Sequence, residues 1–124
     1  MQVSHESGLA YYEQLVLRVK QQIVQGILRP GDKLPSVREM ARQEQLNPNT
    51  VSKAYKQLES QHVINTVHGR GTYVADTTTT PGDSAQVVAT KKQLLTLLTE
   101  IRYLGVPMED VVSWIKAAYE GVEK

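Results

Sequence analysis

The stretch from Leu34 to Val74 constrains this chain most, because it predicts two short helices joined by a tight turn and then a β-hairpin. Ser36 and Glu39 have the S-x-x-E spacing of a capping box, in which each side chain binds a backbone N–H near a helix start. Asn47 suits the position before the second helix, and Pro48 suits its first turn, where a backbone N–H would have no helical partner. This order of elements predicts a mainly α unit with a small β wing, a winged helix-turn-helix.

The second of these helices has an apolar and a polar face. Apolar side chains at Val51, Ala54 and Leu58 have helical spacing, and Tyr55 is expected in the core with them. The remaining surface carries Asn49, Thr50, Ser52, Lys53 and Lys56. Short polar side chains beside lysines can bind base edges and phosphates. We therefore expect this helix to enter the major groove of double-stranded DNA.

A basic loop follows between two β-rich runs, residues 63–67 and 72–75. Its tip, His68-Gly69-Arg70-Gly71, needs glycine for positive φ, and glycine also lets the backbone approach a neighbouring surface closely. Arg70 is then free to project from the tip. We expect the loop to contact the DNA backbone or minor groove beside the recognition helix.

Hydrophobic periodicity and turn residues divide the chain into three parts. The predicted helices are residues 9–25, 36–42, 47–61, 85–103 and 108–120. The predicted domains are a winged helix-turn-helix domain at residues 1–76, a linker at residues 77–84 and a two-helix dimerisation tail at residues 85–124.

The tail helices carry more apolar surface than a lone pair of helices can bury, since a segment this short is at the lower limit for an independent core. Two interpretations stay open: the tail packs against a second subunit, which we favour, or it packs back on its own first domain. Trp114 is expected to be an interface or core anchor. The predicted dimer-interface residues are Leu94, Leu95, Leu98, Ile101, Leu104, Val111, Trp114, Ile115, Ala118 and Tyr119.

Composition narrows the possible functions. Residues 29–74 hold seven basic and four acidic side chains, a net charge of +3, whereas residues 75–124 have −2. This asymmetry favours a polyanionic partner for the middle of the chain. The chain has no cysteine, its histidines are dispersed, and no nucleophile or phosphate-loop motif occurs. We expect no enzymatic activity, no metal, no cofactor, no membrane span and a cytoplasmic location.

Longer motifs allow a family comparison. They are Tyr12-Glu13-Gln14, the run from Gly26 to Glu39, Asn49-Thr50-Val51, Ala54-Tyr55, Leu58-Glu59 and the run from Gly69 to Val74. Over about residues 9–76 the chain resembles the GntR family of bacterial transcription regulators. Its short tail resembles the YtrA-like subgroup, because about fifty residues cannot supply the large effector-binding or aminotransferase-like domain of other relatives. The resemblance implies a homodimer with interlocking tails, often encoded beside transporter genes.

The resemblance also implies DNA contacts from an arginine after the capping box, from the start of the recognition helix and from the wing tip. With the lysines of that helix, the predicted DNA-binding residues are Arg38, Asn47, Pro48, Asn49, Thr50, Ser52, Lys53, Lys56, His68, Gly69 and Arg70. Some relatives carry arginine where this chain has Pro48 and Ser52, so guanine recognition by arginine is absent there. Base specificity is then expected to rest on Asn49, Thr50 and Lys53, or on DNA shape.

These observations predict a homodimeric repressor that binds a palindromic operator, which can belong to its own operon with transporter genes. Two alternatives stay open: a winged-helix module that binds a protein partner, and a loosely specific architectural DNA binder. The sequence predicts neither the operator nor any small-molecule effector.

Overall fold

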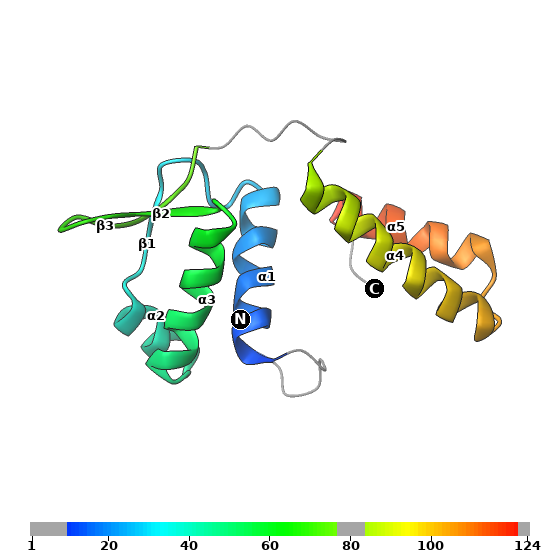
Figure 1. The fold of residues 1–124 in the computed structure, drawn as a ribbon, viewed down its shortest axis with the longest axis horizontal. Coiled ribbons are helices and arrows are strands. Elements are labelled where there is room, and N and C mark those ends of the chain that lie inside the picture. The colour runs from blue at the N-terminus through cyan, green and yellow to red at the C-terminus, as the bar shows by residue number, and fades with distance from the viewer. Residues whose placement is uncertain (1–9, 77–83, 122–124) are drawn as a thin grey trace. The chain divides into compact units, whose positions relative to one another are not determined.

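The structure is a computed structural model that describes residues 10–76 and 84–121. The chain divides into two compact units, residues 1–77 and 78–124. The described part of the first unit holds α1 (Tyr11–Val24), β1 (Lys33–Leu34), α2 (Val37–Glu44), α3 (Pro48–Ser60), β2 (Ile64–Val67) and β3 (Gly71–Val74) (Figure 1). The second holds α4 (Ala85–Tyr103) and α5 (Met108–Glu120). The predicted fold class, mainly α with a small β wing, is confirmed.

The helix starts follow from local hydrogen bonds. At α2 the capping box predicted from the sequence is present: the Glu39 N–H donates to the Ser36 hydroxyl over 3.1 Å, and the Ser36 N–H donates to the Glu39 carboxylate over 3.0 Å. At α3, Oδ1 of Asn47 accepts the N–H of Asn49 over 2.8 Å, and Pro48 occupies the first turn. Both predicted caps are confirmed.

The turn between α2 and α3 is shorter than predicted. The second helix was expected to end at Arg42, but α2 continues through Glu44. Gln45, with φ of 57°, adopts the left-handed conformation that ends the helix. The two additional helical residues place Glu44 inside the core, where only 6% of the residue is exposed.

The sheet has one strand more than the predicted hairpin. Its order is β1-β3-β2, with both pairs antiparallel. β1 pairs Lys33 with Tyr73 and Leu34 with Thr72, so the turn after α1 is tied to the base of the wing. The sequence did not indicate β1, because two residues are too few to show the alternation of a strand.

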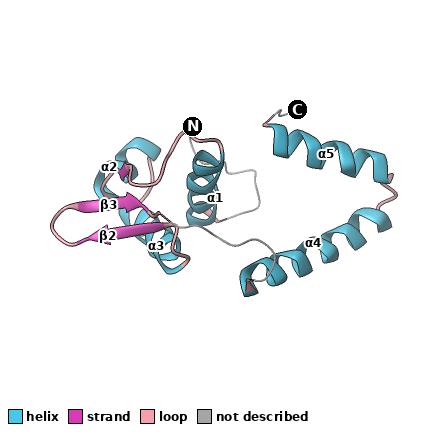
Figure 2. Ribbon diagram, turned by 90° about the horizontal axis from the view of Figure 1, so that it is seen from above, coloured by secondary structure: helices cyan, strands magenta, loops and turns pink. Residues whose placement is uncertain are grey.

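The core of the first unit lies between the three helices and the sheet. Side chains of α1, α3 and β2 fill its centre, and Leu15, Val51, Leu58 and Ile64 are at most 2% exposed. Figures 1 and 2 show α1 and α3 side by side, with the β2–β3 loop extending to the side away from α1. The core therefore fixes one face of α3 and leaves the other toward solvent.

A buried ion pair joins α1 to α2. The two terminal nitrogens of the Arg18 guanidinium, Nη1 and Nη2, donate to the two carboxylate oxygens of Glu44, with 2.8 Å between Nη2 and Oε2. The Arg18 side chain is 19% exposed and that of Glu44 is 6% exposed. A bidentate pair at this depth gives α2 a fixed orientation against α1.

The second unit is a pair of helices with no core of its own. Ser84 caps α4, its hydroxyl accepting the N–H of Val87 over 3.1 Å, and the rest of the predicted linker, residues 77–83, lies outside the described residues. Neither α4 nor α5 has a buried side chain. Figure 2 shows the two helices diverging from the loop that joins them. None of the described helices is long and apolar enough to cross a membrane.

Candidate nucleic-acid interface

α3 separates its side chains into two faces, as its sequence predicts. Val51, Ala54 and Leu58 are 0% exposed. On the opposite face, Asn49, Lys53 and Lys56 are exposed, and Thr50 and Ser52 are half-buried. The helix thus presents an amide, hydroxyls and two ammonium groups along a single solvent-facing surface, which is the set of groups that contacts bases and phosphates.

The start of α3 combines a structural and a candidate binding function. Oδ1 of Asn47 is occupied by the cap, so its amide NH2 is the group left for an outside acceptor. Pro48 is exposed but can offer only its ring. Of the first residues at this end, Asn47 and Asn49 therefore have side chains that can form hydrogen bonds, and Pro48 does not, because its side chain has neither donor nor acceptor.

α2 contributes a basic edge next to α3. Arg38 is exposed, and Arg42 is exposed one turn further along the helix. The pKa of the Glu39 carboxyl is lowered, first by the backbone and side-chain hydrogen bonds from Ser36 and then by the nearby charges of Arg42 and Lys33. Arg42 was not among the predicted DNA-binding residues, although its spacing of four from Arg38 places both on one helix face.

Two hydrogen bonds hold the backbone of the wing tip in place. The N–H of Arg70 donates to the carbonyl of Val67 over 2.9 Å, and the Tyr73 hydroxyl donates to the carbonyl of Arg70 over 3.1 Å. His68, Gly69 and Arg70 are all exposed. These bonds fix the backbone of Arg70 and leave its guanidinium in solvent, so the tip can place one positive charge at a defined distance from α3.

Lys33 of β1 is a second basic side chain at the wing that the sequence did not single out. Its Cε lies 2.8 Å from the position that a Cβ on Gly71 would take, so the lysine stem passes directly over that glycine. Only the pairing of β1 with β3 brings these two residues together. In the sequence, only the positive charge of Lys33 indicates that this residue could contact DNA.

Lys53 does not extend freely from α3. Its Nζ lies 4.2 Å from the centroid of the Tyr12 ring on α1. Lys56 has no such ring contact and no ion pair within the described residues. The two lysines therefore differ in how far their positions are fixed, a difference that their spacing in the sequence does not show.

The predicted interface residues of the tail leave a large apolar surface uncovered. Trp114 is 50% exposed, Leu104 72% and Tyr119 89%. Leu94, Leu95, Ile115 and Ala118 are also exposed, and Leu98, Ile101 and Val111 are half-buried. Trp114 is not a core anchor within this unit.

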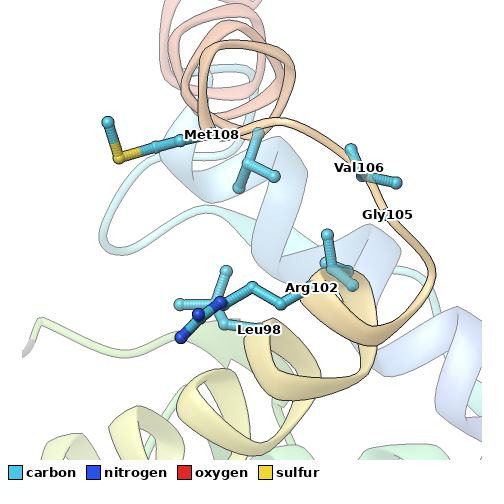
Figure 3. A pocket seen from close by; sticks show the side chains of 7 residues that line it. Leu98, Arg102, Gly105, Val106 and Met108 are labelled. Atoms are coloured by element: carbon cyan, nitrogen blue, oxygen red, sulfur yellow. The ribbon is translucent and has the colours of Figure 1, made fainter.

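Where α4 meets α5, the helices line an open pocket of about 580 Å³. Figure 3 shows Leu98 and Arg102 on the α4 side and Met108 at the start of α5. The lining is mostly apolar, with Arg102 as its charged side chain. Within the described residues, no three histidine, aspartate or glutamate side chains gather in a way that could hold a metal ion.

The family model described as "Bacterial regulatory proteins, gntR family" matches residues 11–74. The HTH-type transcriptional repressor YtrA of Bacillus subtilis (strain 168) is 43% identical to this chain, over 94% of this chain and 89% of the relative.

Two solved structures extend the similarity. A transcriptional antiterminator from Listeria monocytogenes EGD-e superposes with a TM-score of 0.90 at 36% identity, covering 100% of this chain and 93% of the other. The DNA-binding domain of AraR in complex with operator ORX1 has a TM-score of 0.57 at 29% identity, covering 60% of this chain and 95% of that domain.

Proposed function

Because this chain belongs to the GntR family of bacterial regulatory proteins, in its YtrA-like subgroup, we propose that it is a homodimeric transcriptional repressor that binds a palindromic operator. The family and its curated relatives are transcription regulators and not enzymes. The same proposal places the protein in the cytoplasm, where bacterial DNA lies.

The observation that carries DNA binding is the two-faced α3 with basic groups on either side of it. The core holds Val51 and Leu58, which turns Asn49 and Lys53 outward. Arg38 on α2 and the wing tip supply exposed charge in the same unit. We propose that α3 enters the major groove, with the arginines bound to phosphates or the adjacent groove. The AraR domain bound to its operator supports this placement by similarity.

The proposed homodimer rests on the tail. Two helices that bury none of their own side chains leave an apolar patch that solvated monomers rarely keep exposed. A second copy of the tail offers the same surface, so an isologous interface can cover both at once. Twofold symmetry would give two recognition helices, and their operator would then be a palindrome.

Repression is proposed from the relative: the curated protein with 43% identity is a repressor. A dimer bound across a promoter would exclude RNA polymerase without any further domain. We propose that the operator lies in the chain's own operon, as the resemblance to the YtrA-like subgroup implies.

The decisive experiment compares two double variants of the full chain by fluorescence anisotropy. Arg38→Ala with Arg70→Ala should weaken binding to a selected duplex at least tenfold and reduce the slope of log affinity against log salt by about 2, because each lost phosphate contact removes about 0.9. Lys91→Ala with Lys92→Ala removes the same charge from exposed positions of α4 and should leave both quantities unchanged.

The two alternatives give different outcomes in the same assay. Equal affinity of the wild-type dimer for selected and random duplexes would favour an architectural DNA binder. A folded dimer with no affinity for any duplex would favour a protein-interaction module. Sedimentation of each variant, run alongside, shows whether a loss of affinity reflects a loss of the dimer.

A further inference from the structure

The contact between Lys53 and Tyr12 joins the recognition helix to α1. Nζ of Lys53 lies 4.2 Å from the centroid of the Tyr12 ring. Tyr12 is half-buried and packs against the core, so its ring belongs to the fixed part of the unit. Lys53 is exposed on the face of α3 that carries the other polar side chains. The Lys53 ammonium thus lies against a ring that the core holds in place.

This arrangement leaves the ammonium able to bind an anion. A cation over an aromatic face is attracted by the negative charge of the ring face, and the ring covers only one side of the ammonium. An ammonium has three N–H donors, and those that point away from Tyr12 remain directed toward solvent. A phosphate oxygen can therefore bind Lys53 without displacing the ring.

Holding a lysine in place matters for its affinity. The lysine side chain has four rotatable bonds, and binding a phosphate normally requires that these be ordered at an entropic cost. When the ring has already selected the conformation, that cost is reduced before DNA arrives. Lys56, exposed on the same helix without a ring contact in the described residues, bears the full cost.

We propose that Tyr12 is a positioning residue for DNA binding, which holds the Lys53 ammonium where it meets a backbone phosphate beside the groove that α3 enters. This role rests on the proposed DNA-binding function. The expected contribution is about two- to fivefold in affinity, the range of an exposed cation–π contact. Tyr12 acts through Lys53, and it need not touch the DNA.

The test is a double-mutant cycle in the full-length chain, with a duplex enriched by the wild-type protein from a random pool as the probe. Tyr12→Leu should weaken binding about two- to fivefold, whereas Tyr12→Phe, which keeps the ring, should bind as wild type. In a Lys53→Met background, Tyr12→Leu should have no further effect. In a Lys56→Met background it should keep its full effect, which makes Lys56 the matched control.

A merely structural role for Tyr12 would give a different pattern. The loss from Tyr12→Leu would then be the same with and without Lys53, and that additive result would overturn the proposal. Tighter binding by Tyr12→Leu would also overturn it, because the ring would then sequester the lysine. If the random pool yields no enriched duplex, the proposed sequence-specific DNA binding fails, whereas an enriched duplex with an additive cycle removes only the role of Tyr12.

A spectroscopic measurement keeps the proposal testable if Tyr12→Leu does not fold. Protons on Cε of Lys53 should resonate upfield of those of Lys56 in the wild type and in Tyr12→Phe, because Cε is bonded to the Nζ atom that lies over the ring. This shift should persist in the DNA complex. Coincident signals for the two lysines, or loss of the shift when DNA binds, would show that the ring does not hold the bound lysine and would overturn the proposal.

Discussion

The Tyr55 hydroxyl connects the recognition helix to the segment before α2. It donates a hydrogen bond to the carbonyl of Pro35 over 2.7 Å, and only 7% of the residue is exposed. Burial, with a smaller effect from the charge of Glu39, raises the pKa of Tyr55 to about 12. The folded state therefore strongly prefers the protonated phenol.

This shift predicts a pH dependence. Since the folded pKa lies above the value of 10.0 for an unperturbed tyrosine, the stabilising contribution is complete below pH 10 and is lost as the pH rises toward 12. Wild-type protein should lose about 2 kcal/mol of unfolding free energy from this group across that window. Tyr55→Phe should cost about 1 kcal/mol at pH 8 and should lose less stability above pH 10. Urea unfolding of both proteins at several pH values measures the difference; parallel profiles would contradict it.

Glu44 gives a second prediction for single residues. Glu44→Ala removes the largely buried carboxylate that accepts hydrogen bonds from Nη1 and Nη2 of Arg18. The unfolding free energy should fall by about 3 kcal/mol, as for other buried ion pairs that lose one partner. Glu100→Ala, at an exposed position of α4, is the control and should change stability by less than about 0.5 kcal/mol. Equal effects of the two substitutions in chemical denaturation would refute the structural role of the pair.

Some contacts of single residues are predictable from the sequence, and others are not. The caps at Ser36 and Asn47 were predictable, because each depends on neighbours within three residues. The partner of Glu44 lies 26 residues away, and the ring near Lys53 lies on a different helix. The periodicity of apolar residues within one helix does not predict either of these contacts. Such contacts depend on how α1, α2 and α3 pack, which local patterns do not describe.

At the scale of elements, the wing is more firmly attached than a lone hairpin. The N–H of Gly31 donates to the Val74 carbonyl over 2.9 Å, and the N–H of Val74 donates to the Asp32 carbonyl over 2.8 Å. These bonds continue the pairing of β1 with β3. The sequence predicted the hairpin from its glycines and β-rich runs, but the third strand depends on a turn more than thirty residues earlier in the chain.

The two glycines of the wing should differ in their tolerance of alanine. Both have positive φ, 78° at Gly69 and 123° at Gly71, so each substitution is strained. A Cβ on Gly69 meets open space, and a Cβ on Gly71 would lie 2.8 Å from Cε of Lys33, near the end of a flexible side chain that can move aside. Gly69→Ala should cost about 1 kcal/mol. Gly71→Ala should cost more, because its φ lies much further from the left-handed region that other residues can adopt. Thermal unfolding of both variants measures the order, and a larger loss for Gly69→Ala would contradict it.

At the scale of the whole molecule, we propose that the first unit binds DNA and that the second unit forms the dimer. The family and the similarity of the tail to that of a full-length relative support this division, since 94% of the chain aligns. The helix bounds of α4 and α5 were predicted to the residue, because each has a clear start or end signal. Hydrophobic periodicity predicts that each of these helices has an apolar face. It does not predict which surface covers that face.

Trp114→Gln should therefore change the assembly more than the fold of the first unit. The indole is half exposed, and we propose that the partner tail covers it. Sedimentation should show a shift from dimer to monomer, and operator affinity should fall by more than tenfold, because a single recognition helix remains on each molecule. Lys116→Gln, two residues away on α5, should keep both the dimer and the affinity. A Trp114→Gln protein that stays dimeric would place the interface elsewhere.

Because α4 and α5 have no buried side chains, we expect the activity of the protein to depend on its concentration in the cell. In the proposed dimer, a helix pair without a core of its own is stabilised by the tail of the partner subunit, so that tail ordering and dimerisation depend together on protein concentration. Doubling the number of chains in a cell would then increase the paired form more than twofold while pairing is incomplete. Promoter occupancy would respond steeply to synthesis rate, and a repressor acting on its own operon would limit its own abundance without any small molecule.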